Sequence, residues 1–387
     1  MKKIVIAMDS FKGCLTSAEA NEAVAEGIRA VFPNCETVAL PIADGGEGMM
    51  EVLTNAAQGR YVTVRAHNPL MQLHNAVYGI SGDGHTAFIE MAAISGLPLV
   101  PPSHRNPLYT TSYGTGELVY DALERGCKHI ILGLGGSATN DGALGMLQAL
   151  GMRFFDAEDH ELGTDSKGPR MCGVLLQKLC RIDSSTMHPM LSKTKFTVIC
   201  DVNNPFYGPD GAACVFAPQK GAKEEEVKML DDGLKHLAKV IIATTGKNIS
   251  MLPGAGAAGG MGGGLYAWLD ATLKPGIEVM LSAIGFTEKT KGADFIITGE
   301  GQSDRQSMMG KVPSGILKAA MKQKVPVLLI AGSVRDVAML NKCGFESVFS
   351  ITPSPLSLEE AMKPKVASDN LKRAAEQICR LIRCCKP

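Results

Sequence analysis

Three turns rich in acids and glycines carry the clearest chemical indication in this sequence. They are Asp9-Ser10-Phe11-Lys12-Gly13, Asp44-Gly45-Gly46-Glu47-Gly48, and Thr298-Gly299-Glu300-Gly301-Gln302-Ser303-Asp304, which runs on to Lys311. Each follows a short apolar run of the kind that forms a buried parallel strand. Parallel strands end at a common edge of their sheet, and such sheets bind ligands at that edge. Carboxylates beside glycine N–H groups suit Mg²⁺ held near phosphates.

Each turn also has an interpretation without chemistry. Lys12 can be a solvated loop lysine, with Asp9 capping its own turn. The third turn is not a Walker A loop, because Arg305 stands six residues before Lys311, where that motif requires glycine. Three such turns on one edge of one sheet nevertheless favour a ligand site.

A fourth candidate is Gly133-Leu-Gly135-Gly136-Ser137-Ala138-Thr-Asn140-Asp141, between an apolar run and a helical pattern. It fits G-x-G-x-x-A, and Asp156 follows about 20 residues later, as in a dinucleotide fingerprint that would make the protein a nicotinamide-dependent hydroxy-acid oxidoreductase. It also resembles the ATP loop of the superfamily that includes galactokinase and homoserine kinase, with Gly254–Gly264 as a second glycine loop. Asn140-Asp141 can equally be the helix N-cap. These interpretations stay open at this point.

Two further residues are candidates with a plain alternative. Asp201 follows the apolar run KFTVIC and is either a turn-former or a catalytic carboxylate. Arg105 precedes TTSYGTGEL, where hydroxyls and glycines open a predicted helix and can seat an anion. The histidines form no pair with metal-ligand spacing, and the eleven cysteines contain no C-x-x-C, which favours reduced thiols.

The elements that position these residues alternate as strand and helix at both ends of the chain. Strands are expected at 3–7, 36–40, 293–298, 325–331 and 347–351, and helices from the capping box Thr16–Glu19 to about Phe32 and over 314–323. This rhythm predicts βαβ units and a doubly wound parallel sheet. The middle predicts strands at 60–65, 75–80 and 86–91, helices at 115–125 and 143–150, and a long loop over 163–193.

We therefore expect an α/β protein with a Rossmann-like, doubly wound parallel-sheet domain formed by both chain ends. Its predicted bounds are residues 1–65 and 286–387, with a second, mixed-sheet α/β domain inserted at 66–285. A cleft between two such domains is a common place for a ligand.

Composition narrows the class of protein. The chain has 387 residues and a formal net charge of zero, which gives no indication of nucleic acid or an anionic membrane as a partner. No segment approaches the roughly 20 apolar residues that span a bilayer. We expect a cytoplasmic protein that is a monomer or a homodimer.

Ten blocks, in order and spacing over about residues 1 to 355, resemble the bacterial glycerate kinase family of type 1. They are MKKIVIAMDSFKG, ALPIADGGEG, IEMAAISGL, RNPLYTTSYGTGEL, ILGLGGSATNDG, CDVNNPFYGPDGAA, FAPQKGA, GAGAAGGMGGGL, KPGIEVML and FIITGEGQSDRQSMMGKVPSG. The departures include Met8 for a common proline, Cys14 for serine, Met71 for glycine and Gln302 for arginine. They leave the acids and lysines intact.

The resemblance implies ATP-dependent phosphorylation of D-glycerate, usually on the 2-hydroxyl, with the 3-hydroxyl as the alternative. For this chemistry the candidate catalytic residues are Asp44, Asp201 and Lys12, with the two acids as candidate proton acceptors. Candidate substrate-binding residues are Asp9, Ser10, Lys12, Arg105, Ser137, Asn140 and Lys311. Candidate phosphate- or ATP-binding residues are Gly45, Gly46, Gly299, Gly301, Gly135 and Gly136. Glu47, Glu300 and Asp304 are candidate Mg²⁺ ligands.

Overall fold

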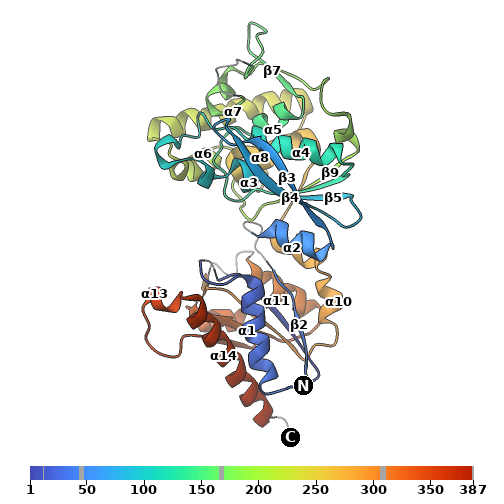
Figure 1. Ribbon diagram of the computed structural model, residues 1–387. Helices are drawn as coiled ribbons and strands as arrows, with labels where there is room; N and C mark the ends of the chain where they lie inside the picture. Colours follow the sequence, from blue (N-terminus) through green and yellow to red (C-terminus); the bar gives the residue numbers. More distant parts are fainter. Residues whose placement is uncertain (12, 43–47, 165–169, 306–310, 386–387) are drawn as a thin grey trace. The chain divides into compact units, whose positions relative to one another are not determined.

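The chain divides into two compact units, which are described separately. The computed structural model describes all residues except 12, 43–47, 165–169, 306–310 and 386–387. Unit 1 comprises Met1–Asp44 and Ile277–Pro387, and unit 2 comprises Gly45–Gly276 (Figure 1). The bounds expected from the sequence, at 65/66 and 285/286, lie further along the chain at both crossings. In the part of the chain that is described, no helix is long and apolar enough to cross a membrane.

Unit 1 is built on a five-stranded parallel sheet. Its strands are β1 (Lys3–Met8), β2 (Glu36–Ala39), β11 (Phe295–Gly299), β13 (Val327–Ala331) and β15 (Ser347–Ser350), in the order β15-β13-β11-β1-β2. Counted within the unit, this is the flavodoxin-like order 2-1-3-4-5, whose direction of winding reverses between β1 and β11. The predicted doubly wound sheet formed by both chain ends is therefore confirmed.

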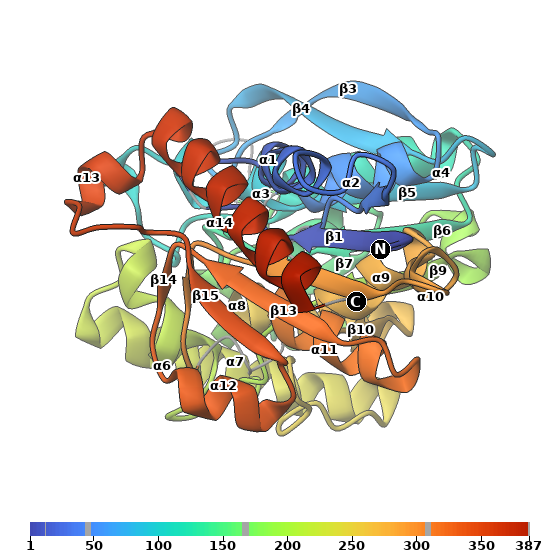
Figure 2. The same ribbon diagram turned by 90° about the horizontal axis from the view of Figure 1, so that it is seen from below.

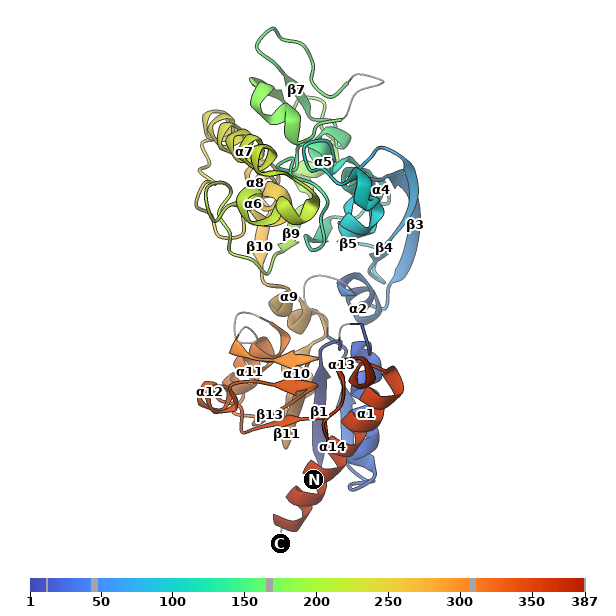
Figure 3. The ribbon, with the colours of Figure 1, turned by 90° about the vertical axis from the view of Figure 1, so that its left-hand side faces the viewer.

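Helices cover both faces of this sheet (Figure 3). One face carries α1 (Ser17–Arg29) and α14 (Pro364–Cys385), and the other carries α11 (Val312–Lys322) and α12 (Val337–Cys343). Alternate residues of β1, namely Ile4, Ile6 and Met8, pack into the core under α1 and α14. The unit also contains α9 (Gly276–Ala283), α10 (Phe286–Thr290), α13 (Leu358–Ala361), and the short strands β12 (Gln302–Ser303) and β14 (Ser333–Val334).

The predicted start of α1 is confirmed. Thr16 Oγ1 accepts a hydrogen bond from the Glu19 N–H, and the Glu19 carboxylate accepts one from the Thr16 N–H at 2.8 Å. This capping box satisfies two N–H groups that the first turn of a helix leaves without intrahelical partners.

Unit 2 is built on a six-stranded mixed sheet, as expected. Its order is β10 (Thr272–Lys274), β9 (Lys195–Ile199), β6 (His129–Gly133), β5 (Thr86–Glu90), β4 (Leu73–Ile80) and β3 (Arg60–His67). The β3–β4 and β4–β5 pairs are antiparallel, whereas β5, β6, β9 and β10 run parallel. The helices are α2 (Met49–Ala56), α3 (Ala92–Ser95), α4 (Tyr113–Glu124), α5 (Leu144–Ala149), α6 (Ala212–Phe216), α7 (Glu224–Thr245) and α8 (Ala257–Leu269).

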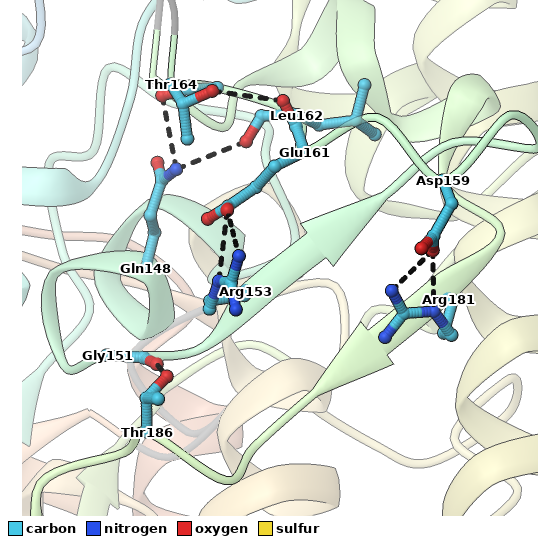
Figure 4. A network of polar contacts seen from close by, with 10 residues as sticks. Gln148, Gly151, Arg153, Asp159, Glu161, Leu162, Thr164, Arg181 and Thr186 are labelled. Atoms are coloured by element: carbon cyan, nitrogen blue, oxygen red, sulfur yellow. Dashed lines mark hydrogen bonds and ion pairs between the residues drawn. The ribbon is translucent and has the colours of Figure 1, made fainter.

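A small antiparallel pair, β7 (Arg153–Phe155) with β8 (Arg181–Asp183), stands outside the main sheet. Figure 4 shows its polar contacts: Arg153 binds the Glu161 carboxylate, and Arg181 binds that of Asp159. Arg181 also lies 3.8 Å from the centre of the Phe155 ring. The expected long loop over 163–193 was therefore wrong at 181–183, because a three-residue strand with Ile182 as its one apolar residue is too short to show a pattern.

The glycine-rich segment 254–264 enters α8 by a left-handed kink. Ala258, Gly259 and Gly260 all have positive φ angles, of 52°, 68° and 90°. A Cβ on Gly259 would lie 2.2 Å from the carbonyl oxygen of Thr139, and one on Gly264 would lie 2.2 Å from that of Gly142. Glycine is thus required where this segment packs, backbone against backbone, on the segment after β6.

The contact of α1 with α14 also depends on a glycine (Figure 2). A Cβ on Gly27 would lie 2.3 Å from the Lys372 carbonyl oxygen. We predict that Gly27→Ala destabilises the protein by roughly 1–3 kcal/mol, because overpacking outweighs the gain in helix propensity. Ala18 of the same helix is exposed, so only helix propensity acts there, and Ala18→Gly should lower the free energy of unfolding by about 1 kcal/mol. Urea unfolding measures both, and a stabilised Gly27→Ala variant contradicts the packing argument.

Candidate active site

The first and third acidic turns lie side by side in unit 1. They follow β1 and β11, which are neighbours, and the Asp9 N–H donates to the Gly299 carbonyl oxygen at 2.8 Å. Asp9 and Glu300 are buried, at 4% and 6% exposure. This is the switch point of the sheet, where doubly wound folds bind ligands. Two turns that each carry a buried carboxylate therefore lie at the position that the topology favours for a site.

Short local bonds orient the acids of these turns. The Asp9 carboxylate accepts from the Ser10 N–H at 2.7 Å. The Glu300 carboxylate accepts from the buried Ser303 hydroxyl at 3.0 Å, and that of Asp304 accepts from the Gln302 amide at 3.1 Å. Oxygen ligands of this kind suit Mg²⁺.

The two predicted phosphate-binding glycines of this turn differ in their surroundings. A Cβ on Gly299 would lie 1.8 Å from the Ile330 carbonyl oxygen, so glycine is required there by the neighbouring strand. A Cβ on Gly301 would meet its nearest atom, in Phe11, only at 3.8 Å. Space beside Gly301 is therefore compatible with the approach of a ligand.

Several predicted site residues lie in or beside the gaps between the described ranges. Lys12, Asp44, Gly45, Gly46 and Glu47 fall outside the described residues. Lys311 is exposed and forms the N-cap of α11.

In unit 2 the predicted glycine turn follows β6, and its backbone is exposed at the two glycines. Gly135 and Gly136 are exposed, and their N–H groups have no hydrogen-bond acceptor among the described residues. The residues on either side are held, since the Leu97 N–H donates to the Gly136 oxygen and the Ala138 N–H to the Ser95 oxygen, both at 2.9 Å. Two N–H groups on a fixed turn can bind an anionic oxygen.

The helix expected at 143–150 is α5, which runs from Leu144 to Ala149, after Ala143 with a φ of 73°. Asp141 is not its N-cap: its carboxylate accepts from both the N–H and the hydroxyl of Ser112, at 2.7 and 2.8 Å. Ser112 is the N-cap of α4, so Asp141 ties the turn to a different helix. Burial raises the pKa of Asp141, and the bonds from Ser112 oppose that effect.

The structure lacks, in this described segment, the two features on which the dinucleotide interpretation depends: a helix N-terminus at the glycines and a carboxylate presented to a ribose. No helix N-terminus lies at Gly135–Gly136 to receive a pyrophosphate. The carboxylate of Asp156 accepts from the N–H groups of Glu158 and His160 within its own turn, at 3.0 and 2.8 Å, instead of being presented to a ribose.

Asn140 is buried without any partner for its amide. Its exposure is 0%, and neither Nδ2 nor Oδ1 has a hydrogen bond within the described ranges. The hydroxyl of Thr139 next to it is equally buried and unpaired. Unpaired buried polar groups cost about 1–3 kcal/mol each, so their presence asks for a partner such as water or a ligand.

Lys220 is the residue of this region that sequence reasoning missed. It is 3% exposed, and its Nζ donates to the Ser137 hydroxyl and to the Thr139 carbonyl oxygen, both at 2.7 Å. Burial lowers the pKa of Lys220 to about 7, against the opposing charge of Asp141. The segment FAPQKGA contains no apolar periodicity that would have indicated a buried lysine.

The last two candidates of unit 2 are each held by the backbone. The Asp201 carboxylate accepts from the N–H of Gly276 at 2.8 Å. Arg105 is half-buried, and its Nε donates to the Val100 carbonyl oxygen at 3.1 Å. A Cβ on Gly221 would lie 2.2 Å from the Arg105 oxygen, so Arg105 adjoins the turn that carries Lys220.

Comparison with known proteins shows the family to which the chain belongs. The model of the glycerate kinase family matches residues 4–383. The chain belongs to the glycerate kinase family. The resemblance drawn from the sequence is confirmed, and the protein is an enzyme of the kinase class.

Relatives agree over nearly the full length. The chain is 47% identical to glycerate 2-kinase of Escherichia coli strain K12 over 377 residues, covering 97% of both chains. It is 46% identical to a glycerate kinase of Halalkalibacterium halodurans over 379 residues, 98% of this chain and 97% of the relative. A crystal structure from Salmonella typhimurium LT2, named provisionally as glycerate kinase 2, superimposes with a TM-score of 0.87 at 44% identity and covers 99% and 98% of the two chains.

The unpaired amide of Asn140 leads to a prediction that separates stability from function. We expect Asn140→Ala to change the free energy of unfolding by less than about 1 kcal/mol, because no bond is lost. Asn68→Ala is the matched control, since the Asn68 side chain accepts from the Leu70 and Gln72 N–H groups at 3.0 and 2.9 Å, and its loss costs about 1–3 kcal/mol. Kinase activity of Asn140→Ala is expected to fall at least roughly ten-fold. A variant that is destabilised yet fully active contradicts both expectations.

The pKa of Lys220 predicts a pH dependence of stability. Folding lowers this pKa from 10.5 to about 7, so between those values the unfolded chain binds more protons and the free energy of unfolding rises with pH. Urea unfolding of the wild type and Lys220→Met from about pH 7 to pH 9.5 measures it. The free energy of unfolding of the wild type should rise relative to that of the variant by up to roughly 1 kcal/mol per pH unit. A constant difference over that interval contradicts the lowered pKa.

Proposed function

We propose that this protein transfers the γ-phosphoryl group of ATP to the 2-hydroxyl of D-glycerate, giving 2-phospho-D-glycerate and ADP. The observation that carries the proposal is full-length membership of the glycerate kinase family, together with 47% identity to a relative named glycerate 2-kinase. The two acidic turns at the β1/β11 switch point support it, because phosphoryl transfer depends on positioning and charge neutralisation.

The residues of unit 1 fit a magnesium ion. Glu300 and Asp304 supply carboxylates one and five residues after the end of β11, and Glu47, which falls outside the described residues, is a third proposed ligand. Mg²⁺ is usually bound by one or two carboxylates together with the phosphates of a substrate. When bound, the ion would neutralise phosphate charge. Glu300 is oriented for this role by Ser303, and Gly301 leaves space beside it.

The residues of unit 2 suit a small hydroxy acid. Glycerate carries one carboxylate and two hydroxyls, so a site for it needs N–H or cationic donors and amide or hydroxyl groups. Gly135 and Gly136 offer N–H groups, Arg105 a guanidinium, and Asn140 an unpaired amide. We assign Ser137 and Asn140 to substrate binding, with Lys12, Lys311, Asp9 and Ser10 as further substrate contacts and Gly45, Gly46, Gly299 and Gly301 as phosphate contacts.

A carboxylate must accept the proton of the attacking hydroxyl. We propose Asp44 for this role, with Asp201 as the second candidate. Asp201 is exposed and oriented by its bond from the Gly276 N–H, which suits a positioned acceptor. Lys12 would neutralise charge that develops on the transferred group.

The test is a coupled assay of ADP release with D-glycerate, ATP and Mg²⁺, followed by identification of the phosphorylated carbon by ³¹P NMR. We expect turnover that requires all three components and a 2-phospho product. A 3-phospho product would refute the regiochemistry, and NAD-dependent oxidation without ATP would refute the kinase.

The same assay tests the residue roles. Asp44→Asn and Lys12→Ala are each expected to lower kcat by roughly 10²–10⁴-fold, because a general base and a charge-neutralising group contribute about that much. Lys247→Met is the control, since Lys247 bonds to carbonyl oxygens at the end of α8 and has no proposed role in the site. If both variants retained wild-type turnover, the active site would have to be placed elsewhere.

A further inference from the structure

The roles proposed above leave Lys220 without a function. It ends a tight turn after α6, in which the Lys220 N–H donates to the Ala217 oxygen at 3.0 Å and the Ala222 N–H to the same oxygen at 3.1 Å. From this turn its side chain reaches the segment after β6 and contacts two acceptors that are two residues apart, Ser137 Oγ and Thr139 O. One side chain therefore holds the residues that directly follow the two glycines of the turn.

Stability alone is a poor reason for this lysine. Removing an ammonium from water is expensive, and a buried charge is often replaced by an apolar side chain of similar size at no cost. The acceptors of Lys220 are a neutral hydroxyl and a carbonyl, and among the described residues the charge that acts on its pKa is that of Asp141. A methionine would fill the same space without this penalty, which points to a role in function.

What Lys220 holds is the base of an exposed anion-binding turn. Gly135 and Gly136 precede Ser137 directly, and their N–H groups are the unpaired donors described above. Gly136 has a φ of 71° and carries no side chain to restrict it, so the tip by itself has wide conformational freedom. The bonds of Lys220 to Ser137 and Thr139 limit that freedom, together with the backbone bonds that Gly136 and Ala138 form.

The same turn reaches a second predicted substrate contact. Gly221, with a φ of 97°, packs its Cα against the Arg105 carbonyl, where a Cβ would lie 2.2 Å from the oxygen. Residues 220 and 221 therefore touch both the glycine turn and the arginine segment. A shift of this turn would move both groups together.

We propose that Lys220 is a positioning residue for glycerate, which holds the Gly135–Ser137 turn so that its N–H groups bind the carboxylate of the substrate. The inference rests on the proposed function for the identity of the ligand. The bridging of the turn by Lys220 does not depend on that function and can be measured in the unliganded protein.

The first measurement is amide hydrogen exchange without ligands. Lys220→Met should speed exchange of the segment 133–143 by roughly ten-fold or more, while the strands of the sheet exchange as in the wild type. The matched control is Lys247→Met, which removes another lysine of unit 2 that bonds to carbonyl oxygens, those of Tyr266 and Ala267. Unchanged exchange in segment 133–143 overturns the proposal.

The second measurement is steady-state kinetics with D-glycerate and ATP varied separately. We expect Lys220→Met to raise the KM for glycerate by roughly ten-fold or more and to leave the KM for ATP within about three-fold, because the turn holds the carboxylate. Equal losses for both substrates, or kinetics equal to those of Lys247→Met, overturn the proposal. A merely structural lysine would lower the thermal midpoint without separating the two KM values.

Two further outcomes are distinguishable. If Lys220→Met does not fold, Lys220→Gln replaces it, since its neutral amide is one atom shorter and weakens the bonds to Ser137 and Thr139, so a KM separation in the same direction is expected. If the wild type does not turn over glycerate, the proposed function fails and the substrate assigned to the turn fails with it. If the wild type turns over and the variant behaves as the control does, the role of Lys220 alone is overturned.

Discussion

The parallel pairing of β1 with β11 is the interaction on which the site of unit 1 depends. It joins Ile4 to Phe295 and continues to Met8 and Gly299, so that segments almost a chain length apart become neighbours. Because the strands are parallel, their carboxyl ends coincide, and the turns that carry Asp9 and Glu300 follow at one edge. Strand β11 tolerates no side chain at Gly299, where the Ile330 carbonyl lies too close. The packing of these strands in the sheet therefore also sets the positions of the acidic turns that form the site.

In unit 2 the candidate site residues are held in position by different contacts. Its glycine turn is held by backbone bonds to the segment after β5, by close packing on the kinked entry to α8, and by one buried lysine. Glycines allow the backbone segments to pack closely. Polar side chains then form hydrogen bonds with the polar groups that this packing buries. Asp141 and Lys220 are satisfied in this way, whereas Asn140 is not. The unpaired amide of Asn140 and the unpaired hydroxyl of Thr139 beside it are marks of a place built for a ligand.

Much of the fold could be predicted from local patterns. The strands of unit 1, the capping box of Thr16 and Glu19 and the mixed sheet of unit 2 all follow from apolar runs, alternation and turn residues. The short strand Arg181–Asp183 could not, because its three residues are polar or partly exposed. The role of Asp141 could not either, since its partner Ser112 is distant in sequence.

The sequence by itself determined the class of fold, the family and the acid-and-glycine turns, because these depend on residue type and on spacing within short segments. Only the tertiary structure decided what each residue touches. Asp141 accepts a hydrogen bond from Ser112 at the start of α4, and Gly299 packs against the neighbouring strand. Lys220 donates hydrogen bonds to Ser137 and Thr139. The physical reason is that burial and hydrogen-bond partners are long-range properties: a lysine in FAPQKGA is desolvated by segments that its neighbours in sequence do not specify.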